Sequence, residues 1–254
     1  MTALPAVQLC RLRKSFGPVR AVDDVDLVLE QGSFWGLVGP NGAGKTTLLS
    51  MAVGLLRPDS GAALVLGHPV WDADTGDQAK AGLGVLPDGL ALPQRLTGRE
   101  LLTYLGLLRG MTMDVVAART EELLAVLDLL DAGPTLIADY STGMRKKVGL
   151  AAAVLHGPAV LVLDEPLEAV DPLSAMTITA ILQAFVTSGG TVLLSTHTMS
   201  LVEQVCDHVA VMADGAVLEV GTVDEVSAGR TLSEAFAAAV GAPPATTGLS
   251  WFAS

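Results

Sequence analysis

Hydrophobic residues near the amino terminus recur with the period of a half-buried β-strand. Val25, Leu27 and Leu29 stand at every second position, with Asp26 between the first two, and this alternation places the apolar side chains on one face. Short apolar segments bounded by glycine or charged residues predict further strands. These segments are 7–12, 34–38 and 62–66.

The middle of the chain has helical spacing instead. Val116, Leu123, Leu127 and Leu130 fall on one face of a helix. The predicted helices of this part are 99–109, 113–130 and 143–155. We therefore expect a helical insertion, at about 83–156, within a scaffold of alternating strands and helices.

Strands and helices alternate again in the last third of the chain. The strands predicted there are 159–163 and 191–195, and the predicted helices, together with one near the amino terminus, are 45–53, 172–186 and 199–206. A hairpin is expected around Asp214-Gly215. This alternation is typical of an α/β fold in which helices cover both faces of a mainly parallel sheet. We predict one domain over 1–240, without internal repeats, and a flexible tail over 241–254.

Composition limits the classes of protein that the chain can form. Its 254 residues are 50% hydrophobic and 17% charged, which excludes disorder for most of its length. No apolar run approaches the roughly 18 residues of a membrane-spanning helix, and the first residues lack the hydrophobic stretch of a secretory signal. We therefore expect a soluble, cytosolic protein. The net charge of −12 disfavours a nucleic-acid surface, which requires clustered Lys and Arg.

The strongest chemical signal is a glycine-rich segment between a predicted strand and a predicted helix. Its residues are Gly39, Pro40, Asn41, Gly42, Ala43, Gly44, Lys45, Thr46 and Thr47. The spacing matches the phosphate-binding loop, in which glycines let backbone amides face phosphate oxygens and the helix adds the positive end of its dipole. We expect Lys45 to contact the β- and γ-phosphates and the Thr46 hydroxyl to bind Mg²⁺. The alternative, a turn that matches by accident, is disfavoured by the flanking elements.

The predicted strand at 161–163 ends in two carboxylates, Asp164 and Glu165. Burying carboxylates costs free energy unless they meet a cation or hydrogen-bond donors. We predict that Asp164 holds Mg²⁺, directly or through water, and that Glu165 polarises the water that attacks the γ-phosphate. For Asp-Glu alone an ordinary turn is the better interpretation, and the phosphate-binding loop reverses that preference.

Two further signals are ambiguous by themselves. Ser141 and Gly143 open a predicted helix whose first turn carries the cations at 145–147, although a helix amino terminus prefers acids. An anion docked on the Ser141 hydroxyl and the Gly143 amide would explain this conflict; a serine-capped surface helix is the alternative.

His197 follows a predicted strand at the sheet edge where ligands bind in open α/β folds. It would donate a hydrogen bond to the γ-phosphate, or it is a structural histidine.

Taken together and in this order, these segments resemble the nucleotide-binding subunits of the ABC transporter family. The resemblance covers about 7–240, with 39–47 as the Walker A loop, 161–165 as Walker B with its catalytic glutamate, and 140–144 as the signature segment. It implies a P-loop NTPase core with a mainly parallel sheet, an antiparallel β subdomain and a helical insertion subdomain. It also implies that the chain binds and hydrolyses ATP with Mg²⁺.

The resemblance assigns further residues and a second subunit. Asp171 ends the segment that corresponds to the D-loop, His197 corresponds to the switch histidine, and Phe16 corresponds to the aromatic residue that stacks on adenine. In the family, two ATP-binding subunits, identical or different, pair head to tail. Each ATP then lies between the Walker A loop of one subunit and the signature, here Ser141 and Gly143, of the other.

The resemblance also implies membrane-spanning permease subunits on a separate chain, which the helical insertion would face. The chain would then lie peripherally on the cytoplasmic face of the cell membrane. The form Tyr-Ser-x-Gly-Met at 140–144 is similar to the exporter branch that moves drugs, peptides, polysaccharides or ions.

The sequence departs from the family pattern at two positions near the expected phosphates. Asp88 stands where the family usually has Gln and where many exporter ATPases have Glu. Its side chain is one methylene shorter than that of Glu, and it would bind Mg²⁺ through a water. Thr142 adds a Cβ where the signature usually has glycine.

Other hypotheses remain open at this stage. These two departures support the hypothesis that the chain is a regulatory module, which binds ATP and hydrolyses it slowly. A soluble ABC protein acting on nucleic acid or ribosomes fits poorly with one cassette and a net charge of −12. Trp251-Phe252 in the tail would contact the permease or lipid headgroups, or belong to a disordered end.

Overall fold

A four-stranded antiparallel sheet forms the amino-terminal part of the fold. The structure is a computed structural model, which describes residues 4–89 and 91–241. Its strands, in spatial order, are β2 (Val19–Leu29), β1 (Val7–Phe16), β4 (Ser60–Val65) and β5 (His68–Pro69). The predicted alternation is confirmed, because Val25, Leu27 and Leu29 are all buried. The first two strands are longer than predicted, since their pairing continues to Phe16 and Val19.

A six-stranded sheet forms the centre of the molecule. Its strands, in spatial order, are β10 (Ala216–Thr222), β9 (His208–Ala213), β3 (Phe34–Val38), β8 (Thr191–Thr196), β7 (Val160–Asp164) and β6 (Leu83–Leu86). Neighbouring strands are parallel except in the β9–β10 pair. The mainly parallel sheet and the hairpin around Asp214-Gly215 are therefore confirmed.

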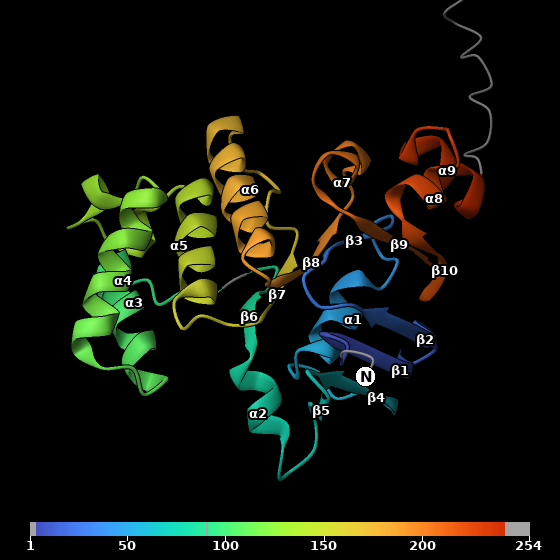
Figure 1. The fold of residues 1–254 in the computed structure, drawn as a ribbon, viewed down its shortest axis with the longest axis horizontal. Helices are drawn as coiled ribbons and strands as arrows, with labels where there is room; N and C mark the ends of the chain where they lie inside the picture. The colour runs from blue at the N-terminus through green and yellow to red at the C-terminus, as the bar shows by residue number, and fades with distance from the viewer. Residues whose placement is uncertain (1–3, 90, 242–254) are drawn as a thin grey trace, which may run out of the picture.

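Helices cover both faces of the central sheet (Figure 1). The α-helices of the described residues are α1 (Lys45–Ala52), α2 (Gly76–Ala81), α3 (Gly98–Leu108), α4 (Met113–Val126), α5 (Thr142–Val154), α6 (Pro172–Thr187), α7 (Met199–Val205), α8 (Val223–Ser227) and α9 (Leu232–Val240). Val160 and Val162 of β7 pack into the core shared with α1, whereas Leu161 and Leu163 pack into the core shared with α5 and α6. Because both faces of this strand are buried, its run is continuously apolar up to Asp164.

The second helix of the middle segment is shorter than predicted. α4 ends at Val126, and Asp128 adopts a φ of 54°, a left-handed conformation that ends a helix. Leu130 therefore lies in a short 3₁₀ turn and is 46% exposed. The prediction that Leu130 shares a buried face with Val116 and Leu127 is wrong.

The helical segment begins later in the chain than residue 83. Residues 83–86 form β6 and pair with β7 in the central sheet, and the first helix beyond them, α3, begins at Gly98. Helices α8 and α9 were not predicted from the sequence. Their starts carry a usable signal, because Thr222 and Thr231 each form a capping box with the glutamate three residues later.

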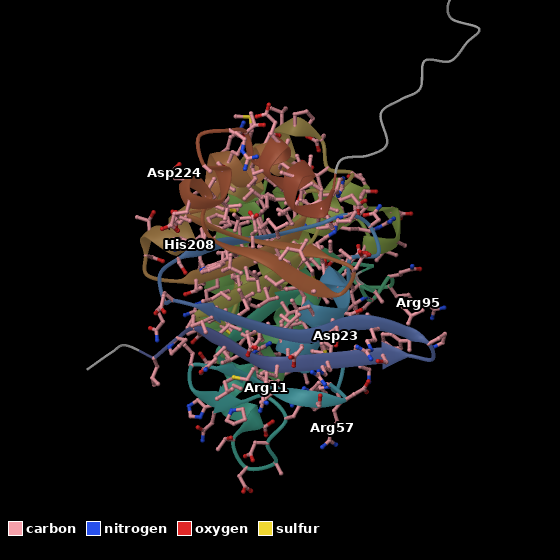
Figure 2. All side chains as sticks on the ribbon, turned by 90° about the vertical axis from the view of Figure 1, so that its right-hand side faces the viewer. Arg11, Asp23, Arg57, Arg95, His208 and Asp224 are labelled. Carbon is pink, nitrogen blue, oxygen red and sulfur yellow. The ribbon has the colours of Figure 1, made fainter. Side chains whose placement is uncertain are left out.

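The two sheets meet at the β9–β10 hairpin. In the view of Figure 2 this hairpin lies above the antiparallel sheet, on which Arg11 and Asp23 are labelled. The backbone N–H of Asp23 donates to the carbonyl oxygen of Gly215 at 2.9 Å. This hydrogen bond fixes the turn of the hairpin against β2.

Within residues 4–89 and 91–241, no helix combines the length and the apolar character that a membrane crossing requires. Gly241 follows α9 with a φ of 92°. The rest of the predicted tail, including Trp251 and Phe252, lies outside the described residues.

A half-buried histidine predicts a pH dependence of stability. His156 follows α5, and its Nε2 lies 3.0 Å from the carbonyl oxygen of Leu83. Burial, reinforced by the charges of Arg109 and Arg119, lowers the pKa of His156 from 6.5 to about 4. Between pH 6.5 and about 4, His156 therefore binds a proton in the unfolded chain but not in the folded protein. The stability that depends on neutral His156 is complete above pH 6.5 and decreases as the pH falls toward about 4.

The variant His156→Gln keeps a donor for Leu83 and removes this titration. We expect the free energy of unfolding, measured in urea at about pH 7.5 and about pH 5, to fall less in His156→Gln than in the wild type. Equal losses in the two proteins would contradict the assignment.

Candidate phosphate-binding and catalytic site

The glycine-rich segment forms the loop between β3 and α1. Gly42 and Gly44 have φ values of 84° and 101°, a region that residues with a Cβ rarely occupy. A Cβ at Gly39 would lie 2.2 Å from the carbonyl oxygen of Met212, and one at Gly44 would lie 2.1 Å from that of Ala21. The loop is therefore held tightly between β2 and β9, with glycine required at two contact points.

The turn of the β9–β10 hairpin supports this loop from one side. The N–H of Gly215 donates to the carbonyl oxygen of Ala43 at 3.0 Å, while its own carbonyl accepts from Asp23. The sequence analysis predicted the turn at Asp214-Gly215 but gave it no part in the site. Only the packing of distant segments reveals that part.

Lys45 lies at the base of the loop and is 7% exposed. Its ammonium donates to the carbonyl oxygens of Gly39 and Pro40 at 2.7 and 3.3 Å, and lies 3.8 Å from Oε1 of Glu165. Burying an ammonium is expensive unless anionic groups compensate it. Its position therefore favours an anion bound at the loop.

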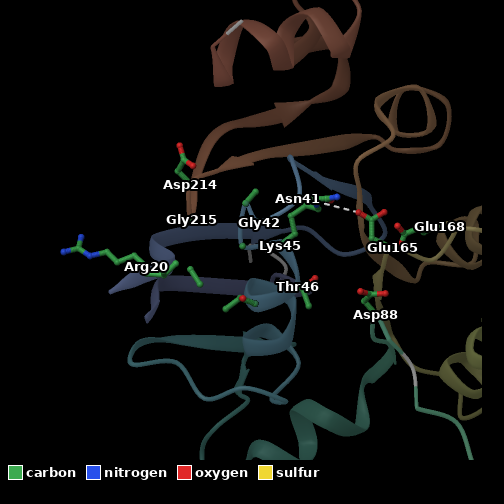
Figure 3. Close-up of a pocket in the computed structure, with 15 residues that line it drawn as sticks. Arg20, Asn41, Gly42, Lys45, Thr46, Asp88, Glu165, Glu168, Asp214 and Gly215 are labelled. Carbon is green, nitrogen blue, oxygen red and sulfur yellow. Dashed lines mark ion pairs between the residues drawn. The ribbon is translucent and has the colours of Figure 1, made fainter. Parts of the chain in front are cut away.

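A cavity of about 620 Å³ opens over the loop (Figure 3). Its lining residues are Val19, Arg20, Ala21, Asn41, Gly42, Ala43, Gly44, Lys45, Thr46, Thr47, Asp88, Glu165, Glu168, Asp214 and Gly215. Carboxylates outnumber cations in this lining, since Lys45 and Arg20 are its basic members. A polyphosphate would be repelled by the acids unless it brought a divalent cation, so the charge balance fits a metal–phosphate complex.

The three predicted metal ligands lie around a smaller cavity of about 60 Å³, which is lined in part by Thr46, Asp88 and Asp164. Asp164 is 4% exposed, and no ion pair compensates its charge in the described parts of the chain. A hydroxyl and one or two carboxylates are oxygen donors of the kind that Mg²⁺ takes beside phosphate oxygens. These residues fit a magnesium ion, which Thr46, Asp164 and Asp88 would hold.

Ser195 links the carboxylate of Asp164 to the backbone of Glu165 at the end of β7, a role that the sequence did not predict. Its hydroxyl donates to Oδ1 of Asp164 and accepts from the N–H of Glu165 at 2.9 Å. Ser195 and Asp164 are register partners on adjacent parallel strands. A polar residue at the carboxyl end of a predicted strand was the available signal.

Glu165 and His197 lie within hydrogen-bond distance of each other. Nδ1 of His197 is 3.2 Å from both carboxylate oxygens of Glu165. Glu165 also adopts a φ of 45°, a sparsely populated conformation that is typical of functional sites. The structure thus brings together Lys45, Glu165 and His197 around one carboxylate, as Figure 3 shows for the Lys45–Glu165 pair.

The predicted signature residues gather elsewhere. Ser141 caps α5 by accepting from the N–H of Met144 at 3.2 Å, and a Cβ at Gly143 would lie 3.1 Å from Oδ2 of Asp171. The pKa of Asp171 is lowered by hydrogen bonds from the backbone and hydroxyl of Ser174, with a contribution from the charge of Lys147. Within this chain, Ser141, Gly143 and Asp171 adjoin one another and do not line the cavity over Lys45.

Phe16 also lies outside the lining of that cavity. It ends β1 and is 52% exposed, with Nζ of Lys14 at 5.8 Å from the centre of its ring. An exposed aromatic face at this position is available for stacking on a base.

A family model described as "ABC transporter" matches residues 22–168, which is more than half of the chain. The chain belongs to the ABC transporter family. It is 37% identical to the daunorubicin resistance ATP-binding protein DrrA3 of Streptomyces coeruleorubidus, over 88% of this chain and 70% of that protein. It is 34% identical to the Nod factor export ATP-binding protein I of Cupriavidus metallidurans, over 89% of this chain and 73% of that protein.

A solved ATP-binding subunit of an ABC transporter has the same fold, with a TM-score of 0.85 and 27% identity over 92% of this chain and 98% of that one. Membership of the ABC transporter family accounts for the combination of a phosphate-binding loop with a helical segment between β6 and β7. The chain therefore carries the ATP-binding domain of this family.

Replacing Gly42 and Gly44 of the loop by alanine, one at a time, separates backbone strain from steric contact. Gly42→Ala meets open space, so we expect only the cost of a positive φ, about 1–2 kcal/mol. Gly44→Ala meets the Ala21 carbonyl as well, and overpacking of this kind adds about 1–3 kcal/mol. Urea unfolding of both variants without nucleotide measures the difference. Equal losses would show that the loop is not clamped against β2.

Proposed function

We propose that this chain hydrolyses Mg-ATP and thereby powers an ABC exporter. The observation that carries the proposal is the convergence on Glu165, which has Lys45 at 3.8 Å and His197 at 3.2 Å. A carboxylate held between a buried ammonium and an imidazole, at the mouth of a phosphate-binding loop, is suited to direct a water at a bound phosphate.

The loop residues would grip the phosphates. The amides of 42–45 and the amino terminus of α1 supply donors, and Lys45 would exchange its carbonyl partners for β- and γ-phosphate oxygens. Thr46, Asp164 and Asp88 would hold Mg²⁺ beside the phosphates, where its positive charge would offset the charge that develops in the reaction. Ser195 would keep one oxygen of Asp164 occupied and leave the other free for the metal.

Glu165 would accept a proton from the attacking water. Nδ1 of His197 must carry a proton to bond an ionised carboxylate. A hydrogen bond from its Nε2 to the γ-phosphate therefore requires the doubly protonated ring. In this arrangement His197 would orient Glu165 and contact the phosphate at the same time.

The complete site would need a second subunit. Ser141, Gly143 and Asp171 lie away from the cavity over Lys45, which supports a head-to-tail pair in which they meet the ATP of the partner. The resistance and export functions in the names of the relatives support an exporter. Permease subunits on a separate chain would then hold this one on the cytoplasmic face of the membrane, against its helical segment.

Replacing Glu165 by Gln removes the proton acceptor and keeps the shape of the side chain. We expect phosphate release from Mg-ATP to fall by about 100-fold or more in the purified protein and in membranes that contain the permease. The affinity for Mg-ATP, measured by calorimetry, should stay within about twofold of the wild type, because Glu165 acts on water and not on phosphate.

Lys45→Ala serves as the contrasting variant, and we expect it to lose Mg-ATP affinity as well as turnover. If Glu165→Gln retained its turnover, or Lys45→Ala its affinity, the proposed roles would be wrong.

A slow, regulatory ATPase is the second candidate function, and one contact favours it. Oδ1 of Asp88 accepts a hydrogen bond from the N–H of Gly89 at 2.8 Å. One oxygen of this short side chain is therefore already bonded to the neighbouring backbone. The variant Asp88→Gln restores the usual family residue. A rise in turnover of about tenfold or more would support the regulatory function, whereas an unchanged or lower rate would support the exporter motor.

A further inference from the structure

The backbone of Glu165 is held from two sides by different elements. Its N–H donates to Ser195 on β8, as described above. Its carbonyl oxygen accepts from Nζ of Lys146 on α5 at 2.7 Å and, at a longer 3.3 Å, from the N–H of Glu168. A charge-assisted hydrogen bond from an ammonium is stronger than a neutral one. Lys146 therefore provides the stronger of the two contacts to this carbonyl.

The residue that Lys146 holds is in an unusual conformation. Glu165 has a φ of 45°, a left-handed value that is rare for a residue with a Cβ and persists only where surrounding contacts maintain it. The direction of its carboxylate depends on this backbone conformation. Loss of the contact to the carbonyl would let the peptide relax and would move the carboxylate away from His197 and Lys45.

Lys146 has no competing partner that would explain its position. Among residues 4–89 and 91–241, no ion pair involves this side chain, and its hydrogen bond to Glu165 links positions 19 residues apart. The neighbouring cations differ: Arg145 donates to Ala138 within the helical segment, and Lys147 is buried beside Asp171.

We propose that Lys146 is a positioning residue for ATP hydrolysis, which holds the Glu165 peptide in its catalytic conformation from the helix that begins at the signature. The inference rests on the proposed function. It also connects the two halves of the site: α5 carries Ser141 and Gly143 at its amino terminus, where the partner's ATP is proposed to bind, and Lys146 on the next turn reaches the catalytic glutamate of its own chain.

The test compares Lys146→Met with the wild type in the full-length chain, with Mg-ATP as the probe. We expect kcat for phosphate release to fall by about 10- to 100-fold, the range that misplacement of a catalytic group produces. The dissociation constant for Mg-ATP should change by less than about twofold. Lys146→Arg, which keeps a cationic donor, should recover most of the rate. Lys80→Met, which removes an exposed lysine of α2, is the matched control and should keep the wild-type rate.

A double-variant comparison separates positioning from support of the fold. If Lys146 acts through the carboxylate, adding Lys146→Met to Glu165→Gln should change the residual single-turnover rate by less than about twofold. The inference is overturned by wild-type turnover in Lys146→Met, or by an equal loss of rate in both backgrounds. If Lys146→Met unfolds, Lys146→Gln, whose shorter amide cannot span the same distance, replaces it. Absence of turnover in the wild type itself would instead overturn the proposed function.

Discussion

The close contact between the glycine-rich loop and its two neighbouring strands is the constraint on which the site depends. Gly39 and Gly44 approach the backbones of β9 and β2 so closely that a Cβ would lie little more than 2 Å from a carbonyl oxygen at each. The Gly215 turn completes the clamp through hydrogen bonds to Ala43 and Asp23. A loop held in this way has its conformation fixed before any ligand arrives, so little free energy is lost in ordering it.

The second constraint is the pairing of β7 with β8, which aligns their carboxyl ends. Asp164 and Ser195 are register partners, and the serine joins the buried carboxylate to the backbone of Glu165. Consecutive residues thereby lie in separate surroundings: Asp164 lies beside Thr46 and Asp88, and Glu165 turns toward Lys45 and His197. Metal binding and proton transfer are best served by carboxylates in different surroundings, and the left-handed φ of Glu165 produces that separation.

The helical side of the molecule is connected to this centre through α5. One end of the helix carries Ser141 and Gly143 beside Asp171, and the following turn reaches Glu165 through Lys146. Its inner face packs into the same core as Leu161 and Leu163 of β7. This helix therefore lies between the proposed subunit interface and the strand that ends at Glu165.

The sequence by itself determined the elements and the residue types of the site. Strand and helix periods, together with the glycine–lysine spacing of the loop, identified β3, α1 and the Asp164-Glu165 pair, because these signals are local. It did not determine where α4 ends, which depends on the left-handed Asp128. It also did not assign roles to Ser195 and Gly215, and it treated Lys146 only as one of three cations near a docked anion. Each acts through a hydrogen bond to a residue distant in the chain, and such partners are chosen only when strands pair and helices pack, since a polar side chain looks the same in sequence whether it faces solvent or a catalytic backbone.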